Sequence, residues 1–171
     1  MSSALSAPFL ACAGVLCVSG VAKLRSPRAA VLALDLLRLP ASTVSVRVLA
    51  AIELAIAVAG LAAPSPPTAL VIGAAYTVFA ITAVRLTSLR ASCGCFGTSG
   101  AAASPVQALL SAVLAAVAAA AAGWPPGGAG WILDRPVTQA LTLTVGVAGC
   151  VYGLVVAYTQ LPGAWSAWSE R

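Results

Sequence analysis

Two cysteines separated by a single glycine are the residues of this sequence best suited to chemistry. Cys93 and Cys95 lie in the segment Ser92-Cys93-Gly94-Cys95-Phe96-Gly97, and Arg90 precedes it. A disulfide between cysteines this close in sequence is strained, and strain makes it easy to open by thiol exchange. A nearby cation favours the attacking thiolate. The spacing therefore predicts a reversible dithiol–disulfide switch.

Two other interpretations of the Cys93 and Cys95 pair stay open. The pair fits two small apolar residues in a turn, and two thiols also suit a soft metal such as Cu(I). Three further cysteines, Cys12, Cys17 and Cys150, lie in apolar segments. Cys12 and Cys17 point about 140° apart on a helix of 3.6 residues per turn, so they do not form a local pair. We expect all three to pack as small apolar residues.

Glu53 and Lys23 are the two charged residues placed where a charge is costly. Glu53 falls in the middle of an apolar segment, so it should face the interior of a helix bundle, where it is either a proton acceptor or a structural hydrogen-bond partner. Desolvation there favours its neutral form. Lys23 ends the first apolar segment, where it could tune a thiol, hold an anionic headgroup or simply reach to the membrane surface. The sequence does not identify a partner for Glu53.

The composition requires a membrane around these residues. Of 171 residues, 61% are hydrophobic and 8% are charged, which is too apolar for a soluble domain. The net charge of +5 comes from basic residues at helix ends, which is a topology signal rather than a nucleic-acid surface. The absence of His removes the commonest metal ligand and proton shuttle.

Hydropathy and proline breaks divide the chain, 1–171, into a single polytopic membrane domain with five spans. The first segment has no basic start and no convincing cleavage site, so we expect it to be a retained helix. A short charged segment at 27–39 predicts an interfacial helix. An Ala-rich fourth span allows close helix packing. The predicted spans are 8–24, 43–63, 68–89, 105–123 and 137–158.

Parity places the Lys23 loop and the Cys93 loop on the same side of the membrane, because two spans separate them. Most of the basic residues are on or near that side, so the positive-inside bias makes it cytoplasmic. A redox role with an exported partner would prefer the opposite orientation. The basic residues concerned are Lys23, Arg25, Arg28, Arg38, Arg47, Arg85 and Arg90.

Three segments together resemble the MauE branch of the DoxX-like membrane proteins. They are Ser19-Gly20-Val21-Ala22-Lys23-Leu24-Arg25-Ser26-Pro27, Glu53-Leu54, and Cys93-Gly94-Cys95-Phe96-Gly97, of which the last is the most specific. The resemblance runs from the first span to about the fourth and leaves out the loop 124–136 and the last span. It implies a DoxX-like four-helix bundle, here with an additional C-terminal span and the short interfacial helix, in a bacterial plasma membrane.

The same resemblance implies a redox-associated role beside a thioredoxin-like partner, in the maturation of a disulfide-rich protein. It does not fix the client. Residue by residue, Lys23, Glu53, Cys93 and Cys95 match the family pattern, and Phe96 and Gly97 complete the turn.

The leading hypothesis is a membrane thiol–disulfide redox protein, a thiol–disulfide oxidoreductase if it turns over. Cys93 and Cys95 would pass electrons between a thioredoxin-like protein and either quinone or a client, while Lys23 tunes the thiolate and Glu53 handles protons. The main rival is a non-catalytic subunit or assembly factor that packs its Ala-rich helices against a larger membrane complex. A transporter fits less well, because few polar residues lie within the spans.

Overall fold

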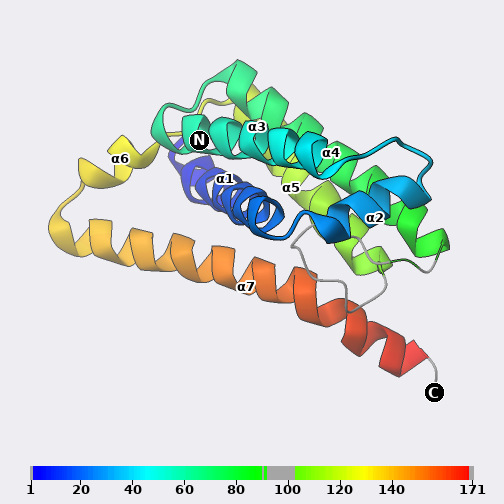
Figure 1. The fold of residues 1–171 in the computed structure, drawn as a ribbon. Coiled ribbons are helices and arrows are strands. Elements are labelled where there is room, and N and C mark those ends of the chain that lie inside the picture. The colour runs from blue at the N-terminus through cyan, green and yellow to red at the C-terminus, as the bar shows by residue number, and fades with distance from the viewer. Residues whose placement is uncertain (1, 90, 92–102, 170–171) are drawn as a thin grey trace.

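The part of the chain that the structure describes is entirely helical. The computed structural model describes residues 2–89, 91 and 103–169, and five of its helices are long and apolar enough to cross a membrane. This confirms the predicted all-α membrane fold with a short helix after the first span and an additional C-terminal span. In chain order the helices are α1 Ser2–Arg25, α2 Arg28–Leu36, α3 Thr43–Ala62, α4 Pro66–Ser88, α5 Pro105–Gly123, α6 Ala129–Leu133 and α7 Val137–Ser169 (Figure 1).

The short helix α2 ends earlier than its charge pattern predicts. The amide of Leu39 donates to the Leu34 carbonyl at 3.0 Å, and the amide of Arg38 donates to the Asp35 carbonyl at 2.9 Å. These two bonds form a Schellman motif. Arg38 takes the left-handed conformation, with φ 58°, a position where glycine is more usual. Because Arg38 leaves the helix, the helical part of the predicted segment 27–39 ends at Leu36.

The first and last membrane helices are longer than predicted. The sequence prediction started the first span at Pro8, yet α1 begins at Ser2 and contains this proline. The last span was predicted to end at 158, whereas α7 continues through Pro162 to Ser169. Proline removes one backbone donor and often marks a helix boundary, but in a membrane neighbouring structure can satisfy the freed carbonyl.

Helix α1 lies at the centre of the bundle, and the tightest helix pair beside it is α4 with α5. Gly73 of α4 makes this close approach possible: a Cβ there would lie 3.5 Å from the Cβ of Ala118 on α5. Tyr76 ties α4 to α1 by donating its hydroxyl hydrogen to the Cys12 carbonyl at 2.6 Å. The main core includes Phe9, Cys12, Ala13, Leu16, Ala57, Ile72, Tyr76, Leu114, Ala118, Ala121 and Tyr158.

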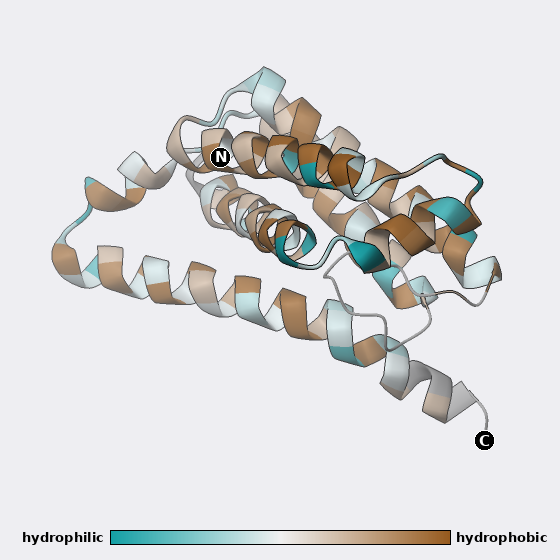
Figure 2. Cartoon of the chain, viewed as in Figure 1, coloured by the Kyte–Doolittle hydropathy of each residue, from teal (hydrophilic) through white to brown (hydrophobic). Residues whose placement is uncertain are grey.

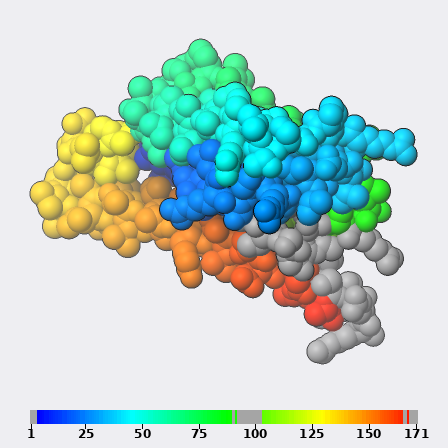
Figure 3. Space-filling view, in the orientation of Figure 1, coloured from blue at the N-terminus to red at the C-terminus, as the bar shows by residue number. Residues whose placement is uncertain are grey.

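Helix α7 is attached along one side and covered by little of the chain. The most apolar stretch of α7 contains no buried residue, whereas more than half of the corresponding stretch of α1 is buried. Figure 2 shows hydrophobic residues recurring along the coloured part of α7, and Figure 3 shows the helix forming one edge of the molecule. Its attachment to the bundle includes Tyr158, whose hydroxyl shares a 2.9 Å hydrogen bond with that of Ser111 on α5.

The Ala-rich helix α5 yields a direct test of the packing. Ala118 is fully buried against α4, whereas Ala116 on the same helix is exposed. We expect Ala118→Leu to lower the free energy of unfolding by about 1–3 kcal/mol, because added methyl groups overpack a filled interface. Ala116→Leu is the matched control and should change it little. Reversible unfolding in detergent, followed by circular dichroism, measures both, and equal effects would contradict this packing.

Candidate functional site

A buried ion pair joins α1 to α3. The ammonium Nζ of Lys23 lies 2.7 Å from Oε2 of Glu53 and 2.8 Å from Oε1. Lys23 is only 5% exposed and Glu53 only 4%. The two residues singled out separately in the sequence therefore form one unit, and Glu53 faces the bundle interior as predicted.

An aromatic ring of α4 completes the surroundings of the ammonium. The Lys23 Nζ lies 4.3 Å from the centre of the Phe79 ring, within the range of a cation–π interaction. The Phe79 ring in turn meets Tyr76 edge-on, with ring centres 5.8 Å apart. With two carboxylate oxygens and a ring around it, Lys23 does not reach out to the membrane surface, which was one of the roles open to it.

The ion pair depends on a close approach of the α1 and α3 backbones. Gly20 stands one turn before Lys23, and a Cβ added there would lie 3.0 Å from the carbonyl oxygen of Ala50. Ala50 stands one turn before Glu53 and is fully buried. Small residues at both positions let the helices meet at short range. The segment 19–27 therefore contributes a glycine that permits close helix packing as well as the charged residue Lys23.

Beside the ion pair is a small apolar cavity between α2, α3 and α4. Its volume is about 90 Å3. Leu49 and Val78 at its rim are exposed on the outer surface of the bundle, where lipid would lie. The lining residues are Lys23, Ala30, Ala33, Leu34, Val46, Leu49, Glu53, Val78, Phe79 and Thr82.

A second cluster of buried residues connects this cavity to the ends of the cysteine segment. Ala33 of α2 lines the cavity and also packs in the second cluster, which includes Ala103 and the partly buried Ala91. The amide of Ala103 donates to the Ala91 carbonyl at 2.7 Å. Cys93 and Cys95, which come between these two alanines in the sequence, lie outside the described residues.

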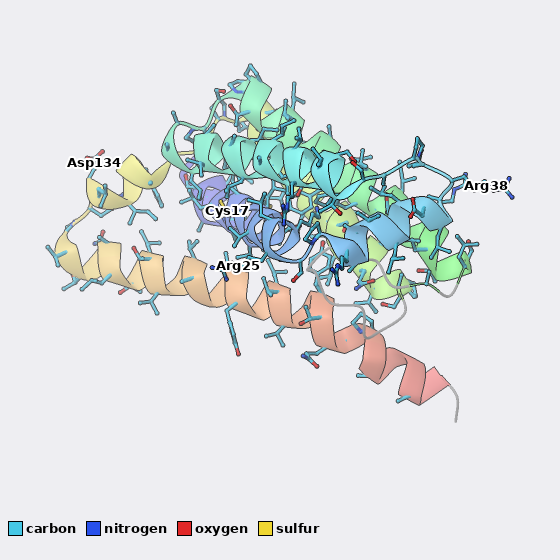
Figure 4. All side chains as sticks on the ribbon, in the orientation of Figure 1. Cys17, Arg25, Arg38 and Asp134 are labelled. Atoms are coloured by element: carbon cyan, nitrogen blue, oxygen red, sulfur yellow. The ribbon has the colours of Figure 1, made fainter. Side chains whose placement is uncertain are left out.

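The three other cysteines differ in their surroundings. Cys12 is fully buried in the main core, and its thiol donates a weak hydrogen bond to the Leu114 carbonyl, with an S to O distance of 3.7 Å. Cys17 is partly buried, Cys150 is exposed, and all three are free thiols. The expectation that they pack as small apolar residues is met most fully by Cys12. Figure 4 labels Cys17 on α1.

Sequence reasoning found both charges of the site but missed three neighbours that shape it. Phe79 resembles any apolar residue of a span in the sequence. Only the packing of α1 against α4 brings its ring close enough to the Lys23 ammonium for a cation–π interaction. Ala33 has no mark in the sequence beyond its place in a predicted interfacial helix. Gly20 carried a signal, because it stands three residues before Lys23 in the segment that resembles the family.

The fold and the buried charge pair define a class: a multi-pass α-helical membrane protein with one ion pair inside the described part of its helix bundle. Residues 1–125 match the family described as methylamine utilisation protein MauE, and the chain belongs to this family. The match covers α1 to α5 and ends before α6 and α7, in agreement with the extent of the resemblance seen in the sequence. No curated protein and no solved structure matches the chain.

The ion pair leads to a prediction about stability. Lys23→Met or Glu53→Met alone leaves one uncompensated buried charge, so we expect each to lower the free energy of unfolding by about 3–5 kcal/mol. The double variant replaces the pair by two apolar side chains of similar length and should recover most of that loss. Reversible unfolding of the four proteins in detergent gives the coupling. Simple addition of the two single losses would show that the residues do not interact.

Proposed function

We propose that this MauE-family chain is a membrane thiol–disulfide redox protein whose reacting groups are Cys93 and Cys95. The dithiol form attacks a disulfide of a thioredoxin-like protein or of a client. A mixed disulfide forms, and the second cysteine then resolves it. The partner gains two electrons and two protons, while the Cys93–Cys95 disulfide forms. In the opposite half of the cycle a reduced thiol partner gives two electrons and two protons to the Cys93–Cys95 disulfide, which restores the dithiol, and the partner becomes a disulfide. If electrons flow onward instead, quinone takes two electrons and two protons from the dithiol, and the products are quinol and the Cys93–Cys95 disulfide.

One observation carries this proposal: Ala91 and Ala103, which flank the cysteine segment in the sequence, lie at the same end of the bundle as the buried charge pair. Ala91 and Ala103 are hydrogen-bonded to each other, and they pack in one cluster with Ala33, which also lines the cavity beside Lys23. Cys93 follows Ala91 by two residues. A cysteine two residues from a packed alanine has a fixed anchor in the chain, and such an anchor suits thiol exchange with a docking partner.

In this proposal Lys23 and Glu53 act as a pair rather than as two separate groups. Oxidation of two thiols releases two protons. If Glu53 takes up one proton while Lys23 releases another, the pair becomes neutral and leaves no lone charge in the bundle. The sequence argument for a neutral Glu53 considered desolvation alone and left out the compensating ammonium. The cavity between the pair and the outer surface has the apolar lining that a quinone ring would need.

Family membership supports the wider setting of the proposal. The family is described by a role in methylamine utilisation, and the resemblance in the sequence implies maturation of a disulfide-rich protein. We propose a maturation role in a bacterial plasma membrane, with no particular client. Thiol exchange at the membrane surface is chemistry that such maturation requires.

Trapping of the mixed disulfide tests the proposal. The full chain, reduced and held in lipid nanodiscs, is mixed with an oxidised thioredoxin whose reduction potential is higher than that of the Cys93–Cys95 pair, quenched with acid and separated without reductant. The parent should pass two electrons to thioredoxin without a lasting adduct. Of Cys93→Ser and Cys95→Ser, the variant that keeps the attacking cysteine should accumulate the adduct, because the resolving thiol is gone.

A matched control and a clear negative result complete this experiment. The variant Cys12→Ser/Cys17→Ser/Cys150→Ser keeps only the proposed pair and should behave as the parent does. The double variant Cys93→Ser/Cys95→Ser should reduce no thioredoxin and form no adduct. Unchanged exchange by that double variant would refute the proposal.

The second candidate function is a non-catalytic subunit, and the exposure of α7 favours it. The sequence pointed to the Ala-rich stretch as the docking surface for this role, but Ala118 and Ala121 are buried inside this chain, so bulky residues there would disturb the protein's own core. Helix α7, by contrast, presents exposed Val145 and Tyr152. If the cysteine variants keep the biological function and bulky substitutions at these α7 positions abolish it, the subunit role is correct.

A further inference from the structure

Three arginines from three helices surround a hollow on the surface of the bundle. Arg25 is the last residue of α1, Arg28 is the first residue of α2, and Arg47 lies in the second turn of α3. The hollow has a volume of about 600 Å3 and is separate from the cavity beside the ion pair. Its lining consists of Arg25, Ser26, Pro27, Arg28, Ala29, Leu32, Thr43 and Arg47. Figure 4 labels Arg25 where α1 ends beside α2.

No carboxylate of the described residues neutralises these arginines. The one ion pair found there is that of Lys23 with Glu53, and Glu53 is the buried acid of the described residues. Asp35 and Asp134, the other acids in the described part of the chain, form no ion pair with any of the three. Three guanidinium groups around one hollow repel one another, and an anion between them would remove that repulsion. Guanidinium is also the side chain best matched to phosphate oxygens.

The helix boundaries place the hollow at the edge of the apolar layer. The membrane-spanning stretch of α1 ends at Arg25, and that of α3 begins at Thr43. Leu32 in the wall of the hollow is 61% exposed, and Val44, next to Thr43, is 71% exposed. Figure 2 shows the hydrophilic junction of α1 and α2 bordered by hydrophobic helix surface. A ligand that fits this surface has an anionic head and an apolar chain attached to it.

We propose that the hollow binds the phosphate group of an anionic phospholipid, with Arg25, Arg28 and Arg47 around the phosphate and Leu32 against an acyl chain. The positive-inside bias explains why arginines occur on this side of the membrane, but not why three converge from separate helices. Arg38 and Arg85 lie on the same side but line neither of these two cavities. The positive-inside bias is therefore enough to explain those two arginines. The apolar wall favours a lipid over an acidic protein as the ligand.

Native mass spectrometry of the full chain released from nanodiscs tests this proposal. The nanodiscs contain phosphatidylglycerol and phosphatidylcholine in equal amounts, and retained lipid is counted. The parent should retain phosphatidylglycerol in preference. Arg28→Gln/Arg47→Gln should weaken that retention by about fivefold for each arginine removed. Arg38→Gln/Arg85→Gln removes the same charge elsewhere and should leave the retention within about twofold of the parent.

Two further measurements separate the proposal from its competitors. Arg28→Lys/Arg47→Lys keeps the charge and should keep at least part of the retention, and a circular dichroism spectrum of the Gln variant equal to that of the parent would show that the Gln variant did not simply misfold. Inorganic phosphate at millimolar concentration should not displace the lipid. The proposal is wrong if both Gln variants lose phosphatidylglycerol alike, if neither does, or if inorganic phosphate displaces the lipid completely.

Discussion

The pairing of Lys23 with Glu53 is the constraint on which the architecture of this bundle depends. A single charge among apolar helices would cost several kcal/mol, whereas two opposite charges in bidentate contact compensate each other. The distances of 2.7 and 2.8 Å require α1 and α3 to approach closely at this depth. Gly20 and Ala50 permit that approach. The pair therefore fixes the register of α1 against α3, and α4 adds Phe79 over the ammonium.

The same end of the bundle contains the other features relevant to function. Helix α2 covers the cavity beside the pair, and its residue Ala33 also packs with the alanines that flank the cysteine segment. The arginine hollow lies at the junction of α1 and α2, beside the start of α3. The ion pair, the alanines that flank the cysteine segment and the arginine hollow thus lie around the same few helix ends. A membrane protein that exchanges electrons with a soluble partner needs its reacting groups at such a surface.

Much of the fold could be predicted from the sequence, because hydropathy and length determine membrane spans almost by themselves. The predicted span at 105–123 agrees with α5 at both ends, and the α3 prediction differs by one residue. Proline misled the prediction at Pro8, where a helix continues through a residue that usually ends one. Helix α7 likewise continues through Pro162. The predicted end of this span at residue 158 came from hydropathy and not from the proline.

The candidate site was predictable only in its parts. Glu53 was expected to be buried because an ionisable residue in a span must avoid lipid, and it is. Its pairing with Lys23 could not be predicted, because a contact between residues thirty positions apart depends on how α1 and α3 pack. Phe79 had no distinguishing mark in the sequence. The roles of Cys93 and Cys95 rest on their spacing and on the family to which the chain belongs.

Differential alkylation in intact cells is the most direct test of the central claim, that the Cys93–Cys95 pair switches between dithiol and disulfide at the membrane surface. A membrane-permeant maleimide is applied with and without prior reductant, and the labelled peptide is identified by mass spectrometry. We expect a fraction of the pair to be oxidised in the cell and to become labelled only after reduction. Thiols that stay fully reduced, in cells with and without an oxidant, would contradict it.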